Sequence, residues 1–194
     1  PIHSSAASDV YKRQVYLSGI SLAILDDASK ERLIQELKGF ALRGGKVIFD
    51  NNFRPQLWNA EQARHWYGLL LPLVDIALIT EDDDQCVWGD EESVEQRCQR
   101  FGCREVVIKR GSEPCQIIRF DAAQPERCTV GAERVAHVVD TCAAGDSFAA
   151  GYLAGRLTGQ TPEASATLGH QLAATVIQCS GAIIPREAMA HLTQ

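Results

Sequence analysis

One stretch of the sequence combines small residues with a carboxylate in a way that suits phosphate binding and proton transfer. DTCAAGDSFAAGYLAG starts at Asp140, where we predict the end of a strand, and a helix is predicted to open at Asp146. The amides of Ala143, Ala144 and Gly145 would lie unpaired at the helix N-terminus, where free N–H groups and the helix dipole bind anions. A carboxylate beside this anion hole can accept a hydroxyl proton while the amides hold developing phosphoryl charge.

The same residues leave a second interpretation open. Asp146 could serve only as a helix cap, and Gly145 only as a turn residue. Farther along, Gly151 and Gly155 are four residues apart and therefore share one face of the predicted helix. That face is therefore thin and can pack closely.

Polar residues also follow three other predicted strands. DNNFRPQLW starts at Asp50 and contains Arg54, whose guanidinium fork suits a carboxylate or a phosphate. TEDDD starts at Thr80, and an acidic run of this kind is usually a solvated loop. KRG, at 109–111, closes a third strand. A surface arginine and a plain strand exit are the alternative interpretations of the first and third segments.

The elements that must position these segments alternate between strand and helix periods. Strands are predicted at 15–20, 46–50 and 75–80, and in REVVIKRG, QIIRF and ERVAHVVD; helices are predicted at 28–42, 60–71, 91–101, from Asp146 and at 162–180, with a last short helix after Pro185. Asn59 with Gln62 forms a capping-box pattern, and Gly102 is a stop signal. Apolar strands alternating with helices predict a parallel sheet covered on both faces. Ligands of such sheets bind beyond the carboxyl ends of the strands.

Composition argues against several classes of function. The chain has 194 residues, a formal net charge of -6 and interspersed charges, which does not favour nucleic acid or anionic membranes as partners. No run reaches the roughly 18 apolar residues of a spanning helix. Seven cysteines without a C-x-x-C pair indicate reduced thiols in a cytoplasmic protein. Residues 1–14 are small and polar without a period, and we interpret them as a foreign or disordered leader.

The full pattern D-T-x-A-A-G-D-S-F-x-A-G-Y closely resembles the second signature of the ribokinase-like (PfkB) sugar kinase family. The resemblance covers residues 15–194 and implies a three-layer α/β/α fold with a mostly parallel sheet. It implies that Asp146 is the catalytic base and that residues 143–145 form the anion hole. Ala143 stands where the family often has glycine, which is a mild substitution if its φ is negative.

The resemblance also implies binding residues for the nucleotide and for a cation. Asp140 lies where many members bind a monovalent cation, such as K⁺. Lys109 and Gly111 correspond to a wall of the ATP site, where Pro114 replaces a second glycine. His170 is implied to lie against the adenine, although a lone helical histidine is more often packed or solvated.

DNNFRPQLW resembles the D-x-N-x-R-x-x-L-W segment of 2-keto-3-deoxygluconate kinases and nearby fructokinase-like members. The resemblance implies an enzyme that uses ATP to convert this sugar acid to its 6-phosphate, with Arg54 gripping the acid. Asp50 and Asn52 are implied to lie near the phosphates and Mg²⁺. Thr80 and Asp83 replace the family's N-x-x-E, which implies that Asp83 organises Mg²⁺ through water.

Nothing in the sequence matches the family's N-terminal sugar-binding region and small β lid. We therefore expect the chain to be about the C-terminal three-fifths of a homo-oligomeric kinase, with half of the sugar site and no lid. Two other interpretations stay open: a kinase of a neutral ketose such as fructose, and an inactive nucleotide-binding module.

Overall fold

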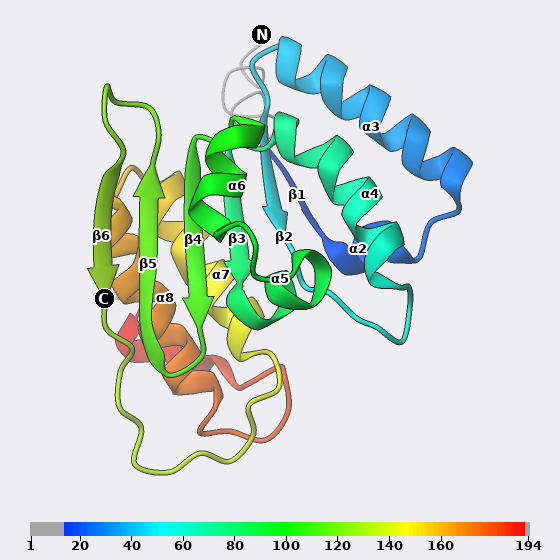
Figure 1. The fold of residues 1–194 in the computed structure, drawn as a ribbon. Coiled ribbons are helices and arrows are strands. Elements are labelled where there is room, and N and C mark those ends of the chain that lie inside the picture. The colour runs from blue at the N-terminus through cyan, green and yellow to red at the C-terminus, as the bar shows by residue number, and fades with distance from the viewer. Residues whose placement is uncertain (1–13, 193–194) are drawn as a thin grey trace, which may run out of the picture. The chain divides into compact units, whose positions relative to one another are not determined.

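The computed structural model describes residues 14–192 of the chain (Figure 1). Its strands are β1 Gln14–Ser18, β2 Lys46–Asp50, β3 Ile76–Thr80, β4 Glu105–Arg110, β5 Glu113–Arg119 and β6 Glu126–Val130. Its helices are α2 Gly19–Ala23, α3 Asp27–Leu42, α4 Ala60–Leu70, α5 Glu81–Trp88, α6 Val94–Phe101, α7 Ala144–Leu157 and α8 Pro162–Val176, with 3-10 turns η1 Leu71–Leu73 and η2 Arg186–Leu192. The predicted leader lies outside the described residues except for Gln14, which opens β1.

The strands follow one another in the sheet in the order β1 to β6. β1, β2 and β3 are parallel, with Ser18 opposite Asp50 and Ile48 opposite Ile76, so their carboxyl ends share one edge. The chain divides into two compact units. Unit 1 comprises the residues up to Ile108 together with Ile118–Glu126, and unit 2 comprises Lys109–Ile117 together with the residues from Arg127 onward.

Unit 1 holds a large apolar core around its parallel strands. β2 is buried from Val47 to Asp50, and β3 is buried at its three central residues, as expected for strands covered on both faces. The capping box of Asn59 and Gln62 opens α4 as predicted. Gly102, with a φ of 82°, ends α6 in the left-handed conformation.

Three predictions in unit 1 are wrong, two because a capping box sets a boundary and one because acidic side chains favour a helix start. A capping box between Ser18 and Ser21 ends β1 and opens α2, where a longer strand was predicted. Ser93 caps α6 through the backbone amide of Gln96, so that helix begins later than predicted. The acidic run after Thr80 is helix α5 rather than a solvated loop, because acidic side chains stabilise the first turn of a helix.

Unit 2 is built on the side-by-side pair α7 and α8 (Figure 1). A Cβ added to Gly151 would lie 2.8 Å from the Cα of Gly169, and one added to Gly155 would lie 2.6 Å from Ser165 Oγ. The predicted thin face is therefore confirmed as the surface on which these helices meet. Thr161 caps α8 as the sequence predicts.

The strand predicted at ERVAHVVD is absent from the described chain, and a strand at β6 was not predicted. The amides of Val139 and Asp140 both donate to the carbonyl of Ile177, so this segment is pinned to the end of α8 instead of joining a ladder. No helix among the described residues has the length and apolar character needed to cross a membrane. The seven cysteines, all within the described range, are free thiols.

Candidate functional site

The start of α7 has an unusual backbone conformation. Ala143 is its N-cap residue, with a φ of 61° and a ψ of 13°. The condition of a negative φ, under which alanine would be a mild replacement for glycine, is therefore not met. An L-residue in this left-handed region is disfavoured by roughly 1–2 kcal/mol, a penalty that glycine does not carry. The chain tolerates strain here, which makes this turn a candidate functional feature.

The amides at this helix start are mostly available to a ligand. Ala144 donates its amide to the carbonyl of Thr141 at 3.2 Å, so the prediction of a free amide is wrong for that residue. Within residues 14–192, no hydrogen-bond partner is found for the amides of Ala143, Gly145 and Asp146. Together with the helix dipole, these three N–H groups make a candidate anion hole, which keeps Ala143 and Gly145 of the predicted set and has Asp146 in place of Ala144.

Two charged side chains of unit 2 accompany this candidate anion hole, the carboxylate of Asp146 and the ammonium of Lys109. Asp146 and Gly145 are both exposed, so the carboxylate is accessible from solvent rather than turned into the core. The ammonium of Lys109 lies 3.9 Å from the position that a Cβ on Gly145 would take. A cation beside unpaired amides strengthens the attraction for a phosphate. Gly111 has a φ of 58° in the turn after β4.

Unit 1 presents a polar turn where β2 ends. The buried side chain of Asn51 bridges two strand ends: its Oδ1 accepts from the amide of Thr80 at 2.9 Å, and its Nδ2 donates to the Thr80 carbonyl at 3.0 Å. Asn52 follows with a φ of 27° and donates its amide to Asn51 Oδ1. In the described part of the chain, Asn52 Oδ1 is buried without a hydrogen-bond partner, and such an orphaned acceptor calls for an explanation such as a missing ligand.

Arg54 extends from this turn with part of its guanidinium occupied. Nη1 donates to the carbonyl of Phe53 at 2.7 Å and lies 3.6 Å from Asp83 Oδ2. The described residues provide no partner for Nε and Nη2, and the side chain is 46% exposed. These two nitrogens form a fork edge that can bind a carboxylate in bidentate fashion.

Comparison with known proteins identifies the group to which these features belong. The family described as "pfkB family carbohydrate kinase" matches residues 11–189. The chain belongs to this family. That match confirms the resemblance read from the sequence.

Curated relatives narrow the likeness within the pfkB family. The 2-dehydro-3-deoxygluconokinase of Escherichia coli (strain K12) is 49% identical over 180 residues, which cover 90% of this chain and 57% of the relative. The protein of the same name from Haemophilus influenzae is 41% identical over 181 residues, covering 92% of this chain and 57% of the relative. The chain therefore spans little more than half the length of these curated relatives.

Solved structures confirm the predicted ribokinase-like fold. A 2-dehydro-3-deoxygluconokinase from Thermotoga maritima has a TM-score of 0.69 at 24% identity, covering 89% of this chain and 56% of the other. Aminoimidazole riboside kinase from Salmonella enterica, complexed with its riboside and an ATP analog, has a TM-score of 0.74 at 22% identity, covering 93% and 63%. A protein described as a ribokinase II from E. coli, complexed with ATP and Mg²⁺, has a TM-score of 0.72 at 21% identity, covering 88% and 54%.

Asp140, the residue implied to bind a monovalent cation in this pfkB chain, fastens two loops together. Oδ1 accepts the amide of Cys142 at 2.8 Å, and Oδ2 accepts the amide of Gly181 at 3.0 Å. These two hydrogen bonds, with that from Cys142 the stronger influence, lower the pKa of Asp140. The residue thus holds the loop before α7 against the turn that precedes η2.

His170 is packed within unit 2 of the pfkB chain. Only 7% of the residue is exposed; its Nε2 lies 3.2 Å from the carbonyl of Val130, and its ring meets the edge of Phe148. Burial lowers the pKa of His170, and the Val130 carbonyl opposes that effect. His170 is therefore a packed residue of unit 2. Its contact with adenine stays a prediction.

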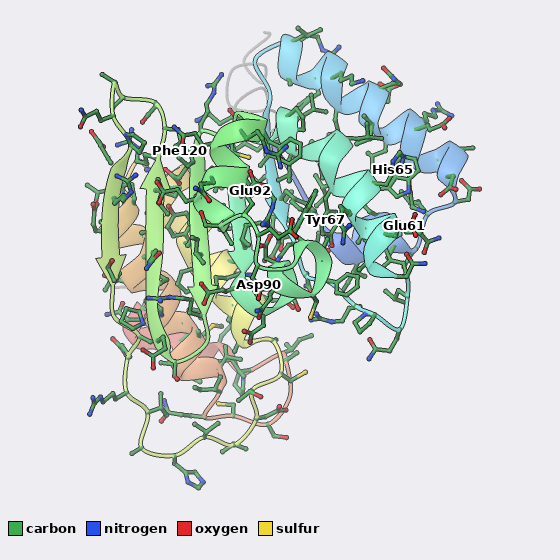
Figure 2. All side chains as sticks on the ribbon, viewed as in Figure 1. Glu61, His65, Tyr67, Asp90, Glu92 and Phe120 are labelled. Carbon is green, nitrogen blue, oxygen red and sulfur yellow. The ribbon has the colours of Figure 1, made fainter. Side chains whose placement is uncertain are left out.

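Two residues that support the turn after β2 were not predicted from the sequence. Gly19 is one: an added Cβ would lie 2.1 Å from both the Asn51 carbonyl oxygen and Tyr67 Oη, so only glycine fits beside the turn. Tyr67, labelled on α4 in Figure 2, donates its buried hydroxyl to that carbonyl. Burial, followed by the charges of nearby carboxylates, raises the pKa of Tyr67 above its ordinary range, so the phenol stays a donor.

The acidic run also contains a residue of a buried ion pair that no sequence pattern predicted. Asp84 Oδ2 accepts from Arg97 Nη1 at 2.5 Å, and both side chains are almost fully buried. Burial raises the pKa of Asp84, and the hydrogen bond and charge of Arg97 oppose the rise. Asp84 therefore fastens α5 to α6, which separates its role from that of its neighbour Asp83.

Proposed function

We propose that the protein carrying this chain transfers the γ-phosphoryl group of ATP to a sugar acid, with 2-keto-3-deoxygluconate (2-dehydro-3-deoxygluconate) converted to its 6-phosphate. The observation that carries the proposal is the start of α7, where unpaired amides stand beside the exposed carboxylate of Asp146. The kinase names of the curated relatives support the reaction class, and their substrate supports the acceptor.

The anion hole fits the phosphates of ATP. The amides of Ala143 and Gly145 can donate to phosphoryl oxygens, and Lys109 adds a positive charge within reach of the same backbone. Preorganised donors of this kind are most effective where charge develops during transfer, because they need no reorganisation. We therefore assign the anion hole to the transferred group, and Lys109 and Gly111 to the nucleotide side.

Asp146 accepts the proton of the acceptor hydroxyl at a carboxylate oxygen. A carboxylate is too weak a base to remove an alcohol proton in advance, so proton transfer accompanies the departure of the phosphoryl group from ADP. Most of the rate enhancement in such a reaction comes from holding the hydroxyl in line. Asp146 is thus an orienting group first and a base second.

Arg54 selects the acceptor through its carboxylate. The Nε and Nη2 edge of its guanidinium can donate two parallel hydrogen bonds to the oxygens of a carboxylate, and bidentate pairs of this type are stronger than neutral hydrogen bonds. The orphaned Oδ1 of Asn52 offers an acceptor for a donor group of the ligand in the same turn. A neutral ketose would leave the arginine fork without a partner.

Mg²⁺ accompanies ATP in this reaction and neutralises charge on the phosphoryl group. Among residues 14–192, no three or more His, Cys, Asp or Glu side chains gather as a metal site.

A kinetic comparison of two acceptors tests the proposal. ATP turnover is measured with 2-keto-3-deoxygluconate and with fructose, for the wild-type protein and for Arg54→Ala. A charge-assisted pair contributes about 1.5–3 kcal/mol, so we expect the variant to raise the KM for the sugar acid about 10- to 150-fold. The KM for ATP should stay within about twofold, since nothing in the proposal places Arg54 at the nucleotide.

The outcomes separate the competing functions. Preference for fructose, together with an Arg54→Ala variant that behaves like wild type, would establish a neutral-sugar kinase. ATP binding without turnover on either acceptor would establish a nucleotide-binding module.

A further inference from the structure

The four acidic residues that open α5 have different surroundings. Glu81 and Asp82 are exposed, Asp84 is buried against Arg97, and Asp83 lies between these extremes with a side chain that is 24% exposed. Successive residues of a helix point about 100° apart, so neighbours in this run reach different parts of unit 1. Only Asp83 reaches the turn that carries Arg54.

Asp83 holds that turn through one oxygen. Its Oδ2 accepts the amide of Phe53 at 3.1 Å and lies 3.6 Å from Arg54 Nη1. Nη1 also donates to the Phe53 carbonyl, so the backbone of Phe53 and the carboxylate of Asp83 together fix one edge of the guanidinium. Asn51 fastens the other side of the turn to the end of β3. The edge formed by Nε and Nη2 is thereby aimed away from the protein's own contacts.

The same geometry disfavours Asp83 as a group that organises Mg²⁺. The positively charged guanidinium of Arg54 lies 3.6 Å from Asp83 Oδ2. It would repel a divalent cation that bound to the same carboxylate. The hydrogen bond from the Phe53 amide occupies the oxygen further. Asp83 is therefore placed to serve the arginine rather than a metal ion.

We propose that Asp83 is a positioning residue that sets the specificity of the site by orienting Arg54 toward the carboxylate of the sugar acid. The inference rests on the proposed function, because it takes Arg54 to be the carboxylate-binding group. It replaces the metal role that the sequence resemblance implied for Asp83.

The test uses Asp83→Asn and Asp83→Ala in the protein that carries this chain, with Asp82→Asn as the matched control that removes a charge from the same run. Steady-state kinetics give kcat, the KM for 2-keto-3-deoxygluconate, the KM for ATP and the Mg²⁺ concentration for half-maximal rate. We expect the sugar-acid KM to rise about 3- to 10-fold in Asp83→Asn and more in Asp83→Ala, which also loses the bond to Phe53. The ATP KM, the Mg²⁺ midpoint and the values for Asp82→Asn should stay within about twofold.

A double-mutant cycle with Arg54→Ala separates positioning from general support of the fold. If Asp83 acts through Arg54, adding Asp83→Asn to Arg54→Ala changes the sugar-acid KM by less than about twofold, because the group to be positioned is gone. Equal effects of Asp83→Asn in both backgrounds would overturn the inference. Thermal unfolding of each variant checks that it folds. If Asp83→Ala misfolds, Asp83→Asn still provides the test, because it keeps an acceptor for the Phe53 amide.

The remaining outcomes distinguish this inference from the proposed function. A Mg²⁺ midpoint raised fivefold or more in Asp83→Asn, with an unchanged sugar-acid KM, assigns Asp83 to the metal and refutes the positioning role alone. An Arg54→Ala variant with an unchanged sugar-acid KM refutes the proposed carboxylate contact itself, and the positioning role falls with it.

Discussion

Replacing Ala143 by glycine should stabilise unit 2, although glycine is destabilising inside a helix. Ala143 has a φ of 61°, where its Cβ crowds the backbone. The family often has glycine here, and alanine is a mild replacement for it only where φ is negative. The structure does not meet that condition, and the left-handed conformation is the one in which alanine and glycine differ most.

The size of the effect follows from two opposing terms. Removing the Cβ relieves about 1–2 kcal/mol of left-handed strain. Glycine makes the unfolded chain more flexible, which takes back about 0.4–1 kcal/mol. We therefore expect Ala143→Gly to raise the free energy of unfolding by about 0.5–1 kcal/mol, or Tm by roughly 1–4 °C for a chain of this size.

Amide hydrogen exchange resolved to α7 measures this change within its own unit. The expected gain corresponds to about two- to fivefold slower exchange for amides that open with the helix start. Ala154→Gly is the matched control, because Ala154 is an exposed residue inside α7. It should lower protection by about 0.5–1 kcal/mol, as glycine does inside a helix. If Ala143→Gly loses protection as the control does, the reasoning from the left-handed Ala143 is refuted.

Three further substitutions test other parts of the structure. Gly151→Ala should destabilise unit 2 by about 1–3 kcal/mol in chemical denaturation, because its Cβ would lie 2.8 Å from the Gly169 backbone; a neutral effect would contradict the close packing of α7 on α8. Gly19→Ala should destabilise unit 1 by at least as much, since its Cβ would lie 2.1 Å from Tyr67 Oη; an unchanged Tm would show that the turn has room. Burial lowers the pKa of His170 below 6.5, so the folded state binds this proton less tightly than the unfolded state. The free energy of unfolding should therefore fall as the pH drops below 6.5 through the lowered pKa, and His170→Gln should remove that part of the slope; an unchanged pH profile would contradict the buried environment.

Local signals in the sequence predicted the fold well where a cap or stop residue stands beside the element. Asn59 with Gln62, Gly102 and Thr161 each marks a boundary that the structure confirms. The prediction failed where two local signals competed. For α6, the prediction starts the helix at Glu91, whereas Ser93 forms the capping box and the helix begins at Val94.

The parts of the site that the sequence could not give depend on distant contacts. The side chain of Asn51 forms hydrogen bonds with the backbone of Thr80, which is 29 residues away, so no short motif marks Asn51. The alternation of ERVAHVVD is typical of a strand, but bonds to Ile177 keep the segment out of the sheet. The left-handed φ of Ala143 likewise belongs to the turn that leads into α7, and the propensity of alanine does not predict it. The roles of Asp146, Arg54 and Lys109 stay predictions, which rest on residue type, on position after strands and on the family resemblance.

The most direct test of the central claim pairs ATP binding with phosphoryl transfer in Asp146→Asn. This substitution keeps the size of the side chain and removes the group that accepts the hydroxyl proton. We expect the turnover of 2-keto-3-deoxygluconate to fall about 10²- to 10⁴-fold while the Kd for ATP stays within about twofold, because the amides of Ala143 and Gly145 remain in place. Turnover within tenfold of wild type, or a loss of ATP binding that matches the loss of rate, would contradict the assignment of Asp146 as the base beside an anion hole.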